Sequence, residues 1–452
     1  MCDEFGCNSL EAEAGVALYA WAAGLMPLCI APISEELGRR PVYLFGLALF
    51  WVFHLVNAVA QNTATVLVSR FVTGMAGSIG SGIAAGSLSD IYTPAHRGFP
   101  MLLSGFCVYF STGLGGTAFA YVTTHLGWRW VWWIHVIYIG ATVPMFIFMM
   151  PETRSVVILR RWAAKLRKQR GLEDGGRYLT HAEMEKVKLI TALRTSLVRP
   201  LVFLTTEPLC VFFALWVGLA WSVMYVQLAG LPYMMRNIYG FDTEGVGLMY
   251  LTTSVGALFG IMGGLIQDRL YRRMAPTKGV EARLYAPMFG GVLFAIGCFI
   301  TGFTAIPGVP WIASAIGQVV MIAAIMTIYV TAFTYISECY GIYASSAIAG
   351  QSCSRNLVGG CIGFATTSMF EGMTVRWAIV MMGGIASVLA LVPFGAYIYG
   401  PKIRARSKYS RLLMHQEREA MDEERVQRQV RGMDTAGMED YEGDANEKDI
   451  PC

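Results

Sequence analysis

Long apolar stretches alternate with short polar segments along most of this chain. A stretch of about 20 apolar residues is long enough to cross a lipid bilayer as a helix, which satisfies its own backbone hydrogen bonds there. Such stretches lie at about residues 14–33, 42–60, 65–88, 99–122, 130–150, 201–226, 244–267, 286–305, 311–336, 346–369 and 376–399. The pattern therefore predicts an all-α membrane protein with about 11 transmembrane helices.

Two regions do not fit this pattern. Residues 151–199 are basic, and Leu159, Trp162 and Leu166 recur among the charges at helical spacing. This spacing predicts an amphipathic linker along the membrane surface. Residues 401–452 begin basic, turn acidic and lack apolar periodicity, so we expect a largely disordered tail.

Lysine and arginine gather in every second connection between the apolar stretches. Segments 34–41, 151–199, 268–285 and the start of the tail carry most of them, whereas Arg129, Arg236 and Arg376 stand alone in the alternate connections. Cytoplasmic loops of membrane proteins are enriched in basic residues. The linker and the C-terminus are therefore predicted to be cytoplasmic, and residues 1–13 to form an outer segment.

One short charged motif occurs twice. Ala31 to Arg40 and Gly264 to Arg273 both read small-x-Ile-x-acid-x-Leu-x-Arg-Arg. Internal repeats of this kind are typical of secondary transporters, so two related helix bundles are predicted over residues 14–150 and 200–400. Two apolar stretches separate the linker from the second motif, but one precedes the first motif. We therefore expect the N-terminal bundle to lack its first helix.

The composition agrees with a membrane protein and argues against an enzyme. Apolar residues make up 55% of the chain and charged residues 15%, against about 25% charged in soluble domains. The sequence contains no HExxH zinc motif, no glycine-rich phosphate loop and no paired carboxylates within an apolar stretch. Its 10 cysteines form no CxxC pair. We expect no catalytic residue, no metal, no cofactor and no nucleic-acid partner.

The two charged motifs are candidates for a conformational latch. A carboxylate beside guanidinium groups can form charge-assisted pairs, which could hold one bundle against the other and break when the bundles rock. The alternative is ordinary cytoplasmic positive charge without a latch. The candidate latch residues are Glu35, Arg39 and Arg40 in the first motif and Asp268, Arg269, Arg272 and Arg273 in the second.

Glu207 is the one carboxylate clearly inside an apolar stretch, and Pro208, which favours a kink, follows it directly. A buried carboxyl can carry protons near neutral pH. Glu207 is therefore the candidate for proton coupling, with a structural acid at a helix kink as the alternative.

Other polar and aromatic side chains inside the apolar stretches are candidates for a substrate cavity. An arginine in hydrocarbon is costly, so it is expected to face the bundle interior or a wet cavity. Aromatic faces suit flat apolar or cationic compounds. The alternatives are structural hydrogen bonding for the polar groups and a membrane-interface belt for the aromatic ones. The candidates are Arg70, Trp221, Tyr225, Gln351, Arg355 and Asn356.

Small residues recur on one stripe of the stretch near 74–86, and small residues let helices approach closely. Glycines also gather in the following stretch. The candidates for close helix packing, and for surfaces on which helices slide, are Gly74, Gly82, Gly86, Gly115 and Gly116.

Several motifs together resemble the major facilitator superfamily, and within it the fungal drug:proton antiporters with twelve spans. They are residues 31–43 (APISEELGRRPVY), Arg70-x-x-x-Gly74, residues 127–134 (GWRWVWWI), residues 151–168, Glu207-Pro208 and residues 337–356. The resemblance implies the major facilitator fold, with two pseudo-symmetric bundles. It also implies export of drugs, xenobiotics or fungal metabolites by proton antiport and alternating access.

The expected partners are a small-molecule substrate, protons and the lipid bilayer. We expect a monomer in the plasma membrane, with the vacuolar membrane as the other location. Two alternatives stay open: a transporter-like sensor that moves no substrate, and an inactive product of a truncated gene. Within transport, polyamine export is the other interpretation.

Overall fold

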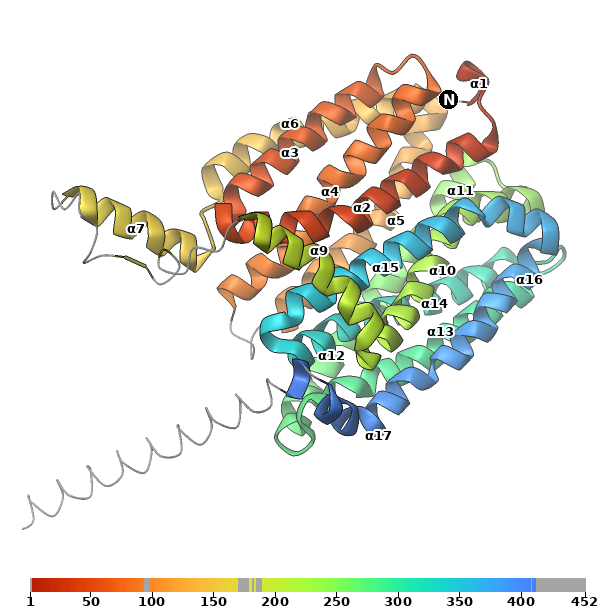
Figure 1. Cartoon of the computed structure of the whole chain (residues 1–452). Helices are drawn as coiled ribbons and strands as arrows, with labels where there is room; N and C mark the ends of the chain where they lie inside the picture. Colours follow the sequence, from red (N-terminus) through yellow and green to blue (C-terminus); the bar gives the residue numbers. More distant parts are fainter. Residues whose placement is uncertain are drawn as a thin grey trace, which may run out of the picture.

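The computed structural model describes residues 2–92, 98–169, 179–180, 183, 189–407 and 409–411. Long helices dominate these residues and form two groups, one from each half of the chain (Figure 1). The tail beyond residue 411 lies outside the described residues, as does much of the linker after residue 169. The predictions for the tail therefore stay untested.

The first group begins with the short helix α1 (Cys2–Phe5) and contains five long helices. Local signals in the sequence separate them. Gly38 has a φ of 100° between the first two, and Gly127 has a φ of 89° between the last two, a backbone conformation that glycine adopts at little cost. The Asn62 side chain accepts a hydrogen bond from the backbone N–H of Thr65 and caps the third. The five are α2 (Ser9–Leu37), α3 (Arg39–Ala58), α4 (Thr63–Ile91), α5 (Gly98–Leu126) and α6 (Trp128–Met149).

The linker forms helix α7 (Ser155–Gln169), and α9 (Leu189–Thr206) leads into the second group. In α7, Leu159 is 59% exposed and Trp162 is 68% exposed; the placement of this linker along the membrane surface stays a prediction. The second group consists of α10 (Pro208–Tyr239), α11 (Thr243–Met249), α12 (Leu251–Lys278), η1 (Gly279–Leu284), α13 (Tyr285–Thr304), α14 (Trp311–Tyr340), η2 (Gly341–Tyr343), α15 (Ala344–Phe364), α16 (Thr366–Leu389) and α17 (Leu391–Arg406).

Two helix pairs join the groups. Helix α2 packs along α15, and α5 packs along α12 and α11; α2 and α15 lie side by side in Figure 1. The larger hydrophobic core fills the second group, around Phe213, Trp216 and Tyr335. A smaller core of Ile30, Val42, Ile79 and Ile83 lies in the first group. The larger core also includes Leu102 and Tyr109 of α5, so it extends across the central interface between the two bundles.

Among the described residues, 10 helices are long and apolar enough to cross a membrane. The sequence predicted about 11. The difference is α15, which falls inside the predicted stretch 346–369 and is more polar than the other long helices because it carries Gln351, Arg355 and Asn356. The expectation that the N-terminal bundle lacks its first helix stays a prediction.

Candidate functional site

Arg39, at the start of α3, is buried in a charge cluster within the first bundle. Its Nε lies 3.0 Å from Asp90 Oδ2, and its Nη1 donates to Ser34 Oγ at 2.6 Å. Arg154, after α6, donates to the other oxygen of Asp90 at 3.2 Å. The predicted pairing with Glu35 is therefore wrong. Glu35 is half-buried and has no hydrogen bond or ion pair among the described residues.

Glu152 closes the same cluster from the end of α6. One carboxylate oxygen accepts the backbone N–H of Arg39 at 2.8 Å, and the other accepts that of Arg40 at 3.3 Å. The Arg40 side chain donates to the carbonyl of Ile147 at 2.6 Å. A side chain at Gly38 would collide with Glu152, so this close contact requires glycine. The first motif thus ties α3, α4 and α6 together within one bundle.

The second motif has a different arrangement. Asp268, near the end of α12, lies 2.7 Å from Arg272 Nη2 one turn later. It also faces the first bundle, because a Cβ added at Gly98, the first residue of α5, would lie 2.7 Å from its Oδ1. The two residues line one pocket with Arg283 and Gln267. Asp268 is therefore the motif carboxylate at which the two bundles meet.

Arg283 is the buried arginine of this second cluster, and the motif does not indicate it. Its Nη2 lies 2.7 Å from Glu338 at the end of α14, and its guanidinium stacks on the Tyr271 ring at 3.5 Å. Arg39 bonds in the same way to Asp90 at the end of α4. By contrast, Arg269 and Arg273 are exposed and have no partner among the described residues.

Glu207 lies between α9 and α10, at the point where helical structure is interrupted before Pro208. The side chain is 3% exposed, as predicted for a buried acid. The Tyr340 hydroxyl donates to Glu207 Oε2 at 3.2 Å. The Phe203 ring, which contacts Tyr340 edge-on, stacks on Tyr409 at 4.7 Å between ring centroids. Glu207 therefore lies beside an aromatic cluster that links α9, α14 and the residues just after α17.

The central interface holds most of the predicted cavity residues. Arg355, on α15, lies against both Trp221 of α10 and Tyr329 of α14, with its Cζ 4.4 Å and 4.7 Å from the ring centroids. The two rings also contact each other, with centroids 5.1 Å apart. The Tyr225 hydroxyl donates to Asn356 Oδ1 at 3.4 Å. Tyr109 of α5 meets the Trp221 ring edge-on at 6.0 Å. The structure thus brings one aromatic residue of the first bundle to the arginine of the second.

Arg70 belongs to a separate group inside the first bundle. Its guanidinium lies over the Trp132 ring at 4.6 Å and within electrostatic range of Tyr19 on α2. His54 and His135 lie beside it with ring centroids 5.2 Å apart, and each Nδ1 bonds a backbone carbonyl one turn earlier at 2.7 Å. Arg70 has no hydrogen-bond acceptor among the described residues.

The predicted packing glycines fall into three classes. Gly74 touches the backbone of Tyr19, and a Cβ at Gly116 would lie 2.6 Å from Tyr250 Cγ across the bundle interface. Gly86 makes room for Arg39, whose Nη2 would lie 2.7 Å from an added Cβ. Gly82 makes an ordinary contact with Pro27, and Gly115 meets only its own helix at Phe119.

Comparison with known proteins decides the family. The Major Facilitator Superfamily profile matches residues 1–364. The chain belongs to the major facilitator superfamily. It is 31% identical over 397 residues to the efflux pump atB of Aspergillus terreus, with 86% of this chain and 83% of that protein covered. It is 30% identical over 411 residues to the MFS-type transporter traF of Penicillium crustosum, covering 90% and 83%.

A solved structure agrees with this assignment. The human organic anion transporter MFSD10 superposes with a TM-score of 0.57 at 16% identity, over 84% of this chain and 83% of that one. The all-α major facilitator fold predicted from the sequence motifs is therefore confirmed, as is the resemblance to fungal members of the superfamily. The chain is a transporter-family membrane protein and not an enzyme.

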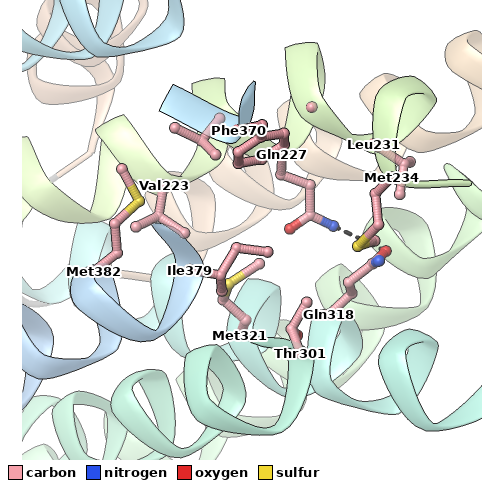
Figure 2. A pocket seen from close by; sticks show the side chains of 12 residues that line it. Val223, Gln227, Leu231, Met234, Thr301, Gln318, Met321, Phe370, Ile379 and Met382 are labelled. Atoms are coloured by element: carbon pink, nitrogen blue, oxygen red, sulfur yellow. Dashed lines mark hydrogen bonds between the residues drawn. The ribbon is translucent and has the colours of Figure 1, made fainter. Parts of the chain in front are cut away.

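One polar feature of this major facilitator chain was not predicted. Gln227 and Gln318 face each other inside the second bundle, with Gln227 Nε2 donating to Gln318 Oε1 at 3.1 Å (Figure 2). Thr252 donates to the same oxygen at 3.0 Å. Gln227 and Gln318 line a cavity of about 30 Å³, which suits about one water molecule and excludes a drug-sized ligand. We therefore assign the substrate site elsewhere.

Proposed function

We propose that this chain exports small organic compounds from the cytoplasm by alternating access of its two bundles. The observation that carries the proposal is the cluster around Arg355, where aromatic and polar side chains from both bundles meet at the central interface. Major facilitator transporters bind their substrates between two such halves. The naming of a relative as an efflux pump agrees with the outward direction.

We infer that the end of the bundles that carries Arg39, Asp268 and α7 faces the cytoplasm, since basic residues gather there. The C-terminus is then cytoplasmic. We propose the plasma membrane as the location, with the vacuolar membrane as the second candidate, and a monomer as the working unit. In this orientation Asp268 acts as a cytoplasmic latch, because it meets the start of α5 in the other bundle.

We propose proton antiport as the energy source, with Glu207 as the coupling group. The buried carboxylate, at the start of α10, accepts a hydrogen bond from Tyr340 of α14. Rotation of α10 or of α14 would therefore change the environment of the carboxylate. A change of environment between two bundle arrangements shifts the proton affinity of a buried acid. Substrate and proton could then exchange in alternation.

Transport is tested with the full chain in proteoliposomes under an imposed pH gradient. Uptake of a labelled panel of neutral, anionic and cationic aromatic compounds is measured with and without the gradient. Gradient-dependent accumulation of any member supports proton-coupled transport. Uptake that does not depend on the gradient would exclude proton antiport but would still support transport. No movement of any compound, in protein that unfolds cooperatively, favours the sensor or the inactive product.

A further inference from the structure

The central interface leaves several hydrogen-bond donors without acceptors. Among the described residues, the Tyr109 hydroxyl, Gln351 Nε2, and Nε and Nη1 of Arg355 are shielded from solvent and unpaired. Gln351 precedes Arg355 by four residues on α15, which places both on one face of the helix. Buried polar groups of native proteins are normally paired, so each of these donors needs an explanation. The amide and guanidinium nitrogens can only donate and the hydroxyl can donate, so an acceptor would satisfy each of them.

The acids of the described membrane helices do not supply that acceptor. Four of them have partners elsewhere: Asp90 with Arg39, Glu338 with Arg283, Glu207 with Tyr340, and Glu13 with Thr367. Among the described residues, none of the others forms an ion pair with Arg355 either. The amide oxygen of Asn356 is already taken by Tyr225. Among the described residues, the positive charge of Arg355 in the interface therefore has no acidic partner.

The aromatic rings at this place are also already in use. The faces of Trp221 and Tyr329 hold the Arg355 guanidinium at 4.4 Å and 4.7 Å. A cationic ligand seeking those faces would meet the arginine first and be repelled by it. The sequence-based expectation of flat cationic compounds, and with it polyamine export, is disfavoured by this geometry.

Access to the arginine is compatible with a ligand. The Arg355, Trp221, Tyr225 and Tyr329 side chains are half-buried, although they lie in the middle of long helices. Tyr109, from the other bundle, lies within electrostatic range of both Arg355 and Tyr329. A group bound here would touch both bundles, which is where a transported compound must bind.

We propose that the central interface binds an organic anion, with a carboxylate on Arg355 and the Tyr109 hydroxyl and an aromatic body beside Trp221 and Tyr329. The inference rests on the proposed transport function and names its substrate class. The carboxylate supplies the acceptors that the interface lacks, and charge-assisted hydrogen bonds to arginine are among the strongest in proteins. The aromatic rings supply apolar area for the rest of the ligand.

The test measures equilibrium binding to the purified full chain at pH 7 with three probes of one shape. They are 2-naphthoate, its neutral amide, and 2-naphthylmethylammonium. We expect 2-naphthoate to bind about tenfold more tightly than the amide, and the cation to bind least. Arg355→Gln should remove the preference for the anion by weakening 2-naphthoate and leaving the amide unchanged. Arg236→Gln removes the same charge from an exposed site near the end of α10 and should change neither.

A second variant keeps the test valid if Arg355→Gln fails to fold. Tyr109→Phe deletes one unpaired hydroxyl and keeps the ring against Trp221, so it should weaken 2-naphthoate severalfold and spare the amide. Equal binding of anion and amide by the wild-type protein overturns the proposal, as does tighter binding of the cation. Transport of neutral compounds in the proteoliposome assay would then still support export. If no naphthyl probe binds while other compounds are exported, the aromatic anion is likewise excluded.

Discussion

Arg39 and Asp90 form an ion pair whose side chains are only 6% and 11% exposed. Breaking a buried ion pair by removing one partner costs up to about 3–5 kcal/mol, and without Arg39 the Asp90 carboxylate keeps only Arg154, at 3.2 Å. We expect Arg39→Ala to lower the thermal unfolding temperature clearly, whereas Arg269→Ala, at an exposed arginine of the second motif, should leave it unchanged. Intrinsic fluorescence during heating of the purified chain measures both. Equal unfolding temperatures in the two variants would contradict a structural role for Arg39.

Substitution of Glu207 tests, again at the scale of a single residue, whether this side chain couples proton movement to transport. In Glu207→Gln the amide oxygen can still accept the hydrogen bond of Tyr340, so folding and substrate binding should persist. The variant can no longer exchange a proton, and uphill export driven by a pH gradient should be lost while downhill movement stays. Efflux from vesicles with and without the gradient separates the two. Uphill export at the wild-type rate would make Glu207 a structural acid.

At the scale of elements, the packing of α5 against the start of α12 leads to a prediction about Gly116. The neighbouring glycine, Gly115, is the matched control. A Cβ at Gly116 would lie 2.6 Å from Tyr250 Cγ, whereas a Cβ at Gly115 meets only Phe119 of its own helix at 3.9 Å. Gly116→Val should therefore destabilise the protein by about 1–3 kcal/mol, as overpacking does, and slow transport. Gly115→Val should do neither. Thermal unfolding and transport rates are compared for both, and identical behaviour would show that α5 does not pack as described.

Helices could be predicted from the sequence far better than the contacts between them. Apolar length alone located the long helices, because a bilayer imposes it. The partner of Arg39 could not be predicted, since Asp90 lies 51 residues away and reaches it only when α4 packs beside α3. The contacts around Arg355 at the central interface could not be predicted from the sequence for the same reason. Arg355, Trp221 and Tyr225 were marked by their polarity or size inside apolar stretches, but nothing local distinguishes Tyr109 or Tyr329 from other tyrosines.

At the scale of the whole molecule, the balance between the two bundle arrangements depends on Asp268, which meets the start of α5 across the interface. We expect Asp268→Ala to favour opening of the cytoplasmic side without a large loss of stability. Thr334→Cys, in the same pocket, should then react faster with a charged thiol reagent. Glu36→Ala, which removes an exposed acid of the first motif, is the control. Unchanged reactivity in Asp268→Ala would argue against the latch.

The uncompensated charge of Arg355 has an electrical consequence. An anion that leaves the cytoplasm moves with a membrane potential that is negative inside, whereas a cation moves against it. One elementary charge crossing 100 mV corresponds to about 2.3 kcal/mol, or roughly fiftyfold in concentration. A carrier whose central site selects anions could therefore draw on the resting voltage of the cell in addition to any difference in pH.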